Sequence, residues 1–180
     1  MRYAKIEKNS VANGPGIRVV LWCQGCSIHC QGCHNESTWD FDGGYIFNQA
    51  AVQQIVDELK YEHVDGITLS GGHPLEESNI LECIALCQYI RSRFPEKTIW
   101  LYTGLTLTLD QFLYKIRGIA PEHRKHNNIN QLLNLCDVVV DGPYIESQRD
   151  LMQKYCGSSN QRVIDVKKTI QNKQITLYEE

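Results

Sequence analysis

Short apolar runs alternate along the chain with longer stretches in which apolar side chains recur every three or four residues. The short runs are rich in β-branched and aromatic residues and predict strands over 17–22, 66–70, 98–102 and 137–140. The helical spacing predicts helices over 48–60 and 77–93 and a helical stretch near 108–117. Strands and helices that alternate in this way form parallel βαβ units, so the pattern indicates an α/β protein.

Two segments fall outside this alternation. Residues 121–128 are polar and aperiodic, which predicts an exposed insertion. Residues 175–178 have the composition of an edge strand. No low-complexity linker divides the chain, and 180 residues suit one folding unit, so we expect a single domain over 1–180.

Composition and charge narrow the class of protein. The chain has 18 basic and 21 acidic residues and a formal charge of −3, which argues against a broad surface for nucleic acid or anionic lipid. No apolar run approaches the ~18–20 residues that span a bilayer, and the first residues lack a signal-peptide pattern. We therefore expect a cytoplasmic protein that binds neither nucleic acid nor membrane.

The eight cysteines are the unusual feature of the composition, because four of them fall between Cys23 and Cys33. In a cytosol that keeps thiols reduced, such clustering indicates metal or redox chemistry rather than disulfides. Cys26, Cys30 and Cys33 have the spacing C-x3-C-x2-C. Three thiolates can bind three irons of a 4Fe–4S cluster and leave the fourth iron without a protein ligand. Such an open metal position is what a catalytic site needs.

Cys23 leaves a second interpretation open, because it adds a C-x2-C pair with Cys26. Four cysteines, with His29 and His34 close in sequence, could instead form a structural zinc site in an interaction module, and the spacing alone does not decide between the two. Cys23 also fits a small core residue at the end of the first strand. The spacing of the remaining cysteines assigns them no metal; these are Cys83, Cys87, Cys136 and Cys156.

Four stretches of the chain resemble a known family. They are residues 13–18 (NGPGIR), 25–39 with the cysteines, 70–75 (SGGHPL) and 157–162 (GSSNQR). On these motifs the chain resembles the radical S-adenosylmethionine (SAM) superfamily, whose signature is C-x3-C-x2-C after the first strand. Within it, the chain is similar to the family of activases that place a glycyl radical on anaerobic ribonucleotide reductase. The first two stretches are also similar to activases of pyruvate formate-lyase.

The resemblance implies a fold and a set of cofactors. The fold is an incomplete, TIM-like (β/α) barrel with about five or six parallel strands, because a full barrel typically needs ~250 residues. Cys26, Cys30 and Cys33 would hold one 4Fe–4S cluster, whose open iron binds SAM. Reduction of SAM would give a 5′-deoxyadenosyl radical, which takes hydrogen from a glycine of the large reductase subunit. A flavodoxin- or ferredoxin-like protein would supply the electron.

Further cofactor contacts are expected beside the cysteines and at the ends of predicted strands. Ligands bind at the carboxyl ends of parallel strands, and glycines there allow close approach to the backbone. The candidates for cofactor binding are Gly32, Cys33, His34, Gly71, Gly72, Thr103 and Gly104. The family pattern usually has an acidic residue where this chain has His73, so no side-chain role is assigned there. No residue beyond the cluster ligands is assigned a catalytic role.

Three further positions keep two interpretations each. Asp141 could have a functional role, binding a ribose hydroxyl or orienting the partner, or could act as a capping carboxylate. Residues 160–162 offer forked donors that could face a substrate peptide or hold the C-terminal segment. Residues 13–16 could shape the floor of the pocket or form a tight turn before the first strand.

Overall fold

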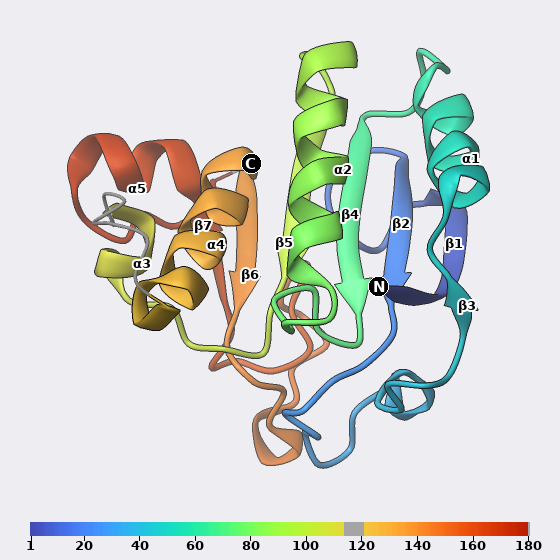
Figure 1. The fold of residues 1–180 in the computed structure, drawn as a ribbon. Coiled ribbons are helices and arrows are strands. Elements are labelled where there is room, and N and C mark those ends of the chain that lie inside the picture. Colours follow the sequence, from blue (N-terminus) through green and yellow to red (C-terminus); the bar gives the residue numbers. More distant parts are fainter. Residues whose placement is uncertain (114–120, 180) are drawn as a thin grey trace.

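The computed structural model describes residues 1–113 and 121–179, and a sheet of seven strands lies at its centre (Figure 1). The strands are β1 Arg2–Ser10, β2 Arg18–Cys23, β3 Tyr45–Ile46, β4 Gly66–Gly71, β5 Thr98–Tyr102, β6 Val138–Asp141 and β7 Arg162–Asp165. Their order in the sheet is β3-β1-β2-β4-β5-β6-β7. β2, β4, β5 and β6 are parallel, whereas β1, β3 and β7 are antiparallel to their neighbours. The expected α/β class is confirmed.

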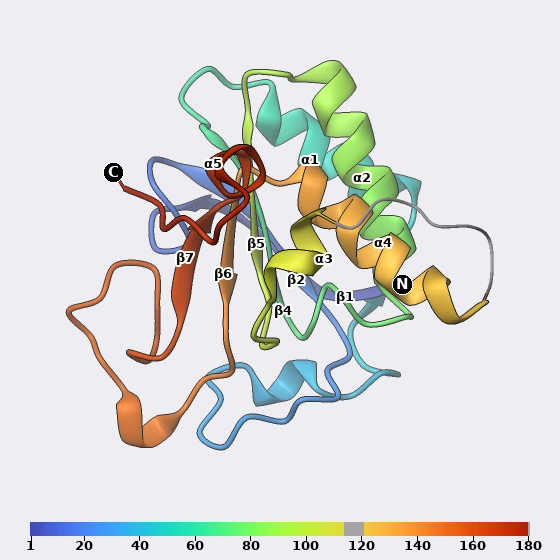
Figure 2. The same cartoon turned by 90° about the vertical axis from the view of Figure 1, so that its left-hand side faces the viewer.

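Helices cover one face of this sheet, as Figure 2 shows for α1, α2 and α4. The helices are α1 Gln49–Leu59, α2 Ile80–Arg93, α3 Leu109–Leu113, α4 Pro121–Leu135 and α5 Val166–Asn172, with short 3-10 turns at Glu36–Thr38 and Glu146–Gln148. Alternate strand residues, such as Leu21 and Leu69, are fully buried in the core that the helices close. Asn48 begins α1, because its side chain accepts hydrogen bonds from the first free backbone N–H groups. Among the described residues, no helix has both the length and the apolar character needed to cross a bilayer.

The opposite face of the sheet carries polar and aromatic residues at the alternate positions. Arg18 is completely buried there and donates hydrogen bonds to the Thr68 hydroxyl at 2.8 Å and to the Ile67 carbonyl at 2.7 Å. Its guanidinium carbon lies 5.5 Å from the centre of the Trp100 ring. Burial lowers the pKa of Arg18 to about 10. The cation is held by several acceptors, which compensate for its loss of water.

The structure corrects the expected number of parallel strands, which is four in the described residues rather than five or six. Only seven residues, 11–17, connect β1 to β2, and a parallel crossover needs a dozen or more. The chain therefore returns in antiparallel fashion and adds edge strands instead of further βα units. The sheet does not close on itself in the order found.

One local prediction is also wrong, and another is confirmed only in part. Residues 121–128 begin α4 rather than forming an insertion. Among the residues of this helix whose burial is described, the buried apolar ones are Ile129, Leu132 and Leu133, which come after the polar stretch. The sequence of the polar stretch itself has no apolar period to detect. Residues 175–178 pair with β7 through an isolated bridge, between Leu177 and Ile164, and through two backbone hydrogen bonds beside it, so the expected edge strand is confirmed only in part. The other predicted strands and helices are confirmed with small shifts of their ends, except that 114–117 lie outside the described residues.

Candidate functional site

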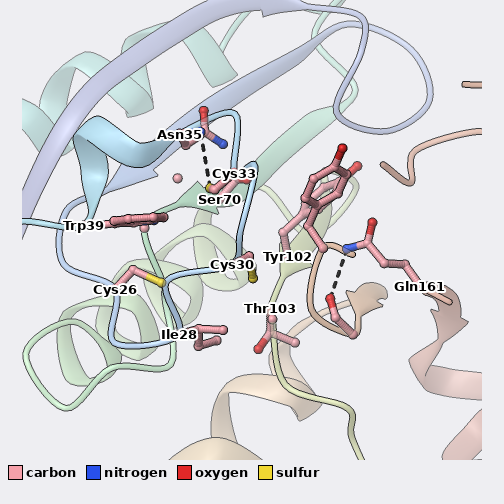
Figure 3. Close-up of a pocket in the computed structure, with 15 residues that line it drawn as sticks. Cys26, Ile28, Cys30, Cys33, Asn35, Trp39, Ser70, Tyr102, Thr103 and Gln161 are labelled. Carbon is pink, nitrogen blue, oxygen red and sulfur yellow. Dashed lines mark hydrogen bonds between the residues drawn. The ribbon is translucent and has the colours of Figure 1, made fainter. Parts of the chain in front are cut away.

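The three cysteines of the C-x3-C-x2-C spacing lie together at the carboxyl ends of the parallel strands. The loop that carries them leaves β2 and runs along the lower end of the sheet in Figure 1. Cys26, Cys30 and Cys33 line one pocket between this loop and the strand ends (Figure 3). We call it the cysteine pocket; its other lining residues are Ile28, Asn35, Trp39, Ser70, Gly71, Gly72, Tyr102, Thr103, Gly104, Gly142, Tyr144 and Gln161.

Backbone hydrogen bonds fix the start of the cysteine loop to the rest of the protein. Gly25 N–H donates to the Thr38 carbonyl at 2.8 Å, and Cys26 N–H donates to the Trp39 carbonyl at 3.2 Å. The Gly25 carbonyl in turn accepts from His73 N–H at 2.9 Å. Gly25 has a φ of 91°, a left-handed conformation that favours glycine. The loop therefore leaves the strand in a defined direction.

Backbone N–H groups point at the sulfur atoms of two of the pocket cysteines. Burial raises the pKa of Cys26, while hydrogen bonds from the backbone of Ile28 and His29 act in the opposite direction. Cys33 Sγ accepts a hydrogen bond from Asn35 N–H at 3.3 Å. N–H groups directed at cysteine sulfur stabilise the thiolate, and in iron–sulfur proteins they tune the reduction potential.

Cys23, the fourth cysteine of this region, lies in the core and not in the pocket. Its side chain is completely buried, and its Sγ is 4.0 Å from Cys83 Sγ of α2. It belongs to the cluster of apolar residues between the sheet and the helices. The structure thus separates Cys23 from the three pocket cysteines and supports its interpretation as a small core residue. The histidine next in sequence to Cys30, His29, stacks on Trp39 with ring centres 4.5 Å apart.

The donor set fits a 4Fe–4S cluster better than a single ion. Within the described part of the chain, no three side chains of His, Cys, Asp or Glu gather around one point as they would for one metal ion. Cysteines that hold a cubane cluster bind different irons and so surround a larger space. Three thiols lining a pocket from one loop are compatible with that arrangement.

The strand ends supply the other wall of the pocket through exposed backbone. Gly71, Gly72, Thr103 and Gly104, four of the predicted cofactor residues, all line it. Gly71 has a φ of 96°, and a Cβ there would lie 2.7 Å from the backbone of Cys23. The positions of these glycines leave peptide groups accessible to polar atoms of a ligand.

His34 and Gly32 occupy different places from these residues. His34 lines an adjoining hollow, which shares Cys33, Ser70 and Tyr102 with the cysteine pocket, and its ring centre is 5.4 Å from that of Tyr144. Gly32 faces the loop after β6, because a Cβ there would lie 2.5 Å from Glu146 Oε2. The contacts of both with a cofactor stay predictions.

The His73 side chain is turned toward two neighbouring polar groups. Its Nε2 is 2.8 Å from the Thr103 hydroxyl and its Nδ1 is 3.2 Å from Glu76 Oε1. The imidazole is nearly completely buried. The residue that departs from the family pattern therefore lies directly behind Thr103, which lines the pocket.

The three positions with two interpretations have clear partners in the fold. Asp141 is buried and accepts hydrogen bonds from Leu107 N–H and from Arg162, so its carboxylate connects the loop after β5 to the start of β7. Gln161 donates to the Gly142 carbonyl at 3.0 Å while it lines the pocket. Residues 13–16 form a turn before β2, and Asn13 also lines the adjoining hollow.

Several residues of the pocket wall were not predicted as site residues. They are Ile28, Asn35, Trp39, Ser70, Tyr102, Gly142 and Tyr144, whereas Gln161 belongs to the predicted segment 160–162. Ser70 and Tyr102 directly precede predicted residues at strand ends, so their sequence position could have indicated that they line the site. Tyr144 belongs to the loop after β6, which the fold brings to the cysteines from more than a hundred residues away.

Comparisons with known proteins agree with this site. A family model described as a 4Fe–4S single cluster domain matches residues 12–164. The chain is 36% identical over 163 residues to the anaerobic ribonucleoside-triphosphate reductase-activating protein of Enterobacteria phage T4, a match that covers 91% of this chain and 93% of that protein. Proteins of the same name from Vibrio cholerae serotype O1 and Escherichia coli (strain K12) are 35% and 34% identical over 89% and 91% of this chain, and over 96% and 97% of theirs.

These matches span the cysteine loop, both glycine-lined strand ends and the loop after β6. The chain belongs to the family of anaerobic ribonucleoside-triphosphate reductase-activating proteins.

Proposed function

We propose that this protein is a radical SAM activase that generates the glycyl radical of the large anaerobic ribonucleotide reductase subunit. The observation that carries the proposal is that Cys26, Cys30 and Cys33 line one pocket together with the glycines of two strand ends, while Cys23 is in the core. This arrangement provides three ligands for a 4Fe–4S cluster and leaves no fourth cysteine of the loop to occupy its remaining iron. A reduced cluster also suits the cytoplasm, the compartment that we propose.

When bound, the reduced cluster and SAM supply a 5′-deoxyadenosyl radical, the species that removes hydrogen from a glycine. The residues of this chain bind and orient the two cofactors. We assign the cluster to the three cysteines and the polar groups of SAM to the peptide groups of Gly71, Gly72 and Gly104 and to the Thr103 hydroxyl. The fold places all of these groups at one edge of the sheet, where α/β proteins bind their ligands.

The aromatic residues of the pocket wall have a separate task. Trp39, Tyr102 and Tyr144 surround the cysteines with apolar ring surface. Such surface excludes water from a reactive intermediate and leaves the radical no nearby solvent to attack.

We also propose that the open sheet is the partial barrel of radical SAM proteins, whose open side admits the glycine loop of the reductase. A flavodoxin- or ferredoxin-like protein stays the expected electron donor.

The test is transfer of a radical to a defined partner. The anaerobically reconstituted protein is mixed with SAM, a reductant and the large reductase subunit, and the glycyl radical is recorded by electron paramagnetic resonance. We expect a signal with the native protein and with Cys87→Ala, a matched cysteine change outside the pocket, and none with Cys30→Ala. A signal with pyruvate formate-lyase and none with the reductase would contradict the choice of partner.

A further inference from the structure

The carboxylate of Glu76 joins the cysteine loop to the segment that follows β4. Its Oε1 accepts hydrogen bonds from Ser27 N–H at 2.9 Å, from the Ser27 hydroxyl at 2.6 Å and from His73 Nδ1 at 3.2 Å. Burial would raise the pKa of Glu76, but the hydrogen bonds from Ser27 and His73 lower it below its usual value. The Glu76 side chain is 16% exposed; its bond to His73 is partly buried, and its two bonds to Ser27 lie on the exposed side of the loop. Ser27 directly follows Cys26, a pocket cysteine.

His73 continues this connection to the end of β5. Because an ionised carboxylate only accepts, Nδ1 of His73 carries the hydrogen of the bond to Glu76. The Thr103 hydroxyl oxygen lies 2.8 Å from Nε2. With the ring neutral and its hydrogen on Nδ1, Nε2 is the acceptor, and the Thr103 hydroxyl is then the donor of this bond. The same hydroxyl oxygen accepts from Leu105 N–H at 3.2 Å.

This bonding decides what Thr103 offers to the pocket. A hydroxyl has one hydrogen and two lone pairs. With its hydrogen directed to His73 and one lone pair accepting from Leu105 N–H, the hydroxyl can only accept a further hydrogen bond, from a ligand of the pocket that the Thr103 residue lines. The hydroxyl is therefore an acceptor, which suits a ligand group that donates hydrogen bonds, such as an ammonium or a ribose hydroxyl.

We propose that Glu76 and His73 are positioning residues that act on both walls of the cofactor site. Glu76 holds the Cys26 side of the cysteine loop through Ser27, and His73 fixes the Thr103 hydroxyl as an acceptor for a donor group of SAM. The inference rests on the proposed function, because it assigns SAM to this pocket. The three connected segments are far apart in sequence, with 49 positions between Ser27 and Glu76 and 30 between His73 and Thr103.

The variant Glu76→Ala removes all three hydrogen bonds, and Glu76→Gln keeps an oxygen that can accept them. Glu77→Ala is the matched control, because Glu77 is the exposed next residue. Three quantities are measured on the full chain: amide hydrogen exchange of residues 26–30 before cluster assembly, iron and sulfide content after it, and the SAM dissociation constant from the change in the resonance spectrum of the reduced cluster. We expect Glu76→Ala to speed exchange and weaken SAM binding by about tenfold each, and Glu76→Gln to restore most of both.

A second variant separates the two halves of the proposal and serves if Glu76→Ala fails to fold. His73→Asn keeps a donor for Glu76 but is too short to reach Thr103. We expect it to leave the exchange of residues 26–30 and the cluster unchanged and to weaken SAM binding about fivefold. Unchanged SAM affinity in His73→Asn, or equal exchange and affinity in Glu76→Ala and Glu77→Ala, would overturn the positioning role. Failure of the native protein to bind SAM would instead reject the proposed function itself.

Discussion

Gly72→Ala tests whether the strand end after β4 and the cysteine loop are packed as closely as the structure shows. The added Cβ would lie 2.5 Å from the Gly25 carbonyl oxygen and 2.9 Å from that of Thr38. Both oxygens belong to backbone that holds the loop, and Gly25 already accepts from His73 N–H. Overpacking costs about 1–3 kcal/mol, and loss of this hydrogen bond adds about 1 kcal/mol, so we expect destabilisation of about 2–4 kcal/mol.

Gly104→Ala is the matched control on the same wall of the pocket, after the neighbouring strand β5. Its Cβ would lie 2.6 Å from Ile28 Cδ1, the end of a flexible side chain that can rotate away. Alanine also lowers the conformational entropy of the unfolded chain, which stabilises the folded protein by about 0.4–1 kcal/mol. We therefore expect the free energy of unfolding to change by less than about 1 kcal/mol.

The assay is thermal unfolding of both variants together with their iron content after anaerobic reconstitution. A cost of 2–4 kcal/mol corresponds to a fall in Tm of about 4–16 °C for a chain of this size. We expect Gly72→Ala to show that fall and to lose iron, because the clash displaces the loop that carries Cys26. A native Tm and iron content in Gly72→Ala would contradict the close packing of Gly72 against the cysteine loop. An equal loss of Tm and iron in Gly104→Ala would contradict it as well.

Two further predictions concern buried charge. Burial would raise the pKa of Asp137, but hydrogen bonds from Lys167, Arg91 and Ile99 N–H lower it below its usual value. The stability that this carboxylate contributes is therefore present above about pH 4 and is lost as the pH falls through the folded-state pKa. Asp137→Asn should therefore cost about 1–3 kcal/mol at pH 7, and less in acid, in urea unfolding curves measured across that range; an equal cost at both pH values would contradict this. Arg18→Met leaves the buried acceptors on Thr68 and Ile67 without their donor and should lower the free energy of unfolding by about 3–5 kcal/mol, whereas a change below about 1 kcal/mol would contradict the hydrogen bonding described.

The central elements of the fold could be predicted from the sequence because each has its own local pattern. α1 has apolar residues at helical spacing, and β4 is a short apolar run that ends in glycines. β1 gives no such signal, because its charged and apolar residues are mixed in a strand that is only partly buried. The start of α4 was missed for a similar reason, since its first residues are polar in sequence and its apolar residues at helical spacing come later.

Some residues of the site are likewise indicated by a local sequence pattern, whereas others are brought there only by the fold. Cys26, Cys30 and Cys33 lie within eight residues of each other, so their spacing alone indicates a ligand set. Tyr144 reaches the same pocket only because β6 lies two strands from β4 in the sheet, and no local pattern contains that information. The role of Glu76 was not visible for the same reason, because it depends on contacts between segments that are distant in sequence.

The most direct test of the central claim is the iron and sulfide content of the anaerobically reconstituted protein and of four single cysteine variants. The account predicts about four irons and four sulfides per chain in the native protein and in Cys23→Ala, because Cys23 packs in the core. It predicts loss of the intact cluster in Cys26→Ala, Cys30→Ala and Cys33→Ala. One zinc in place of iron, or loss of the metal in Cys23→Ala, would contradict a cluster held by three cysteines with one iron left open.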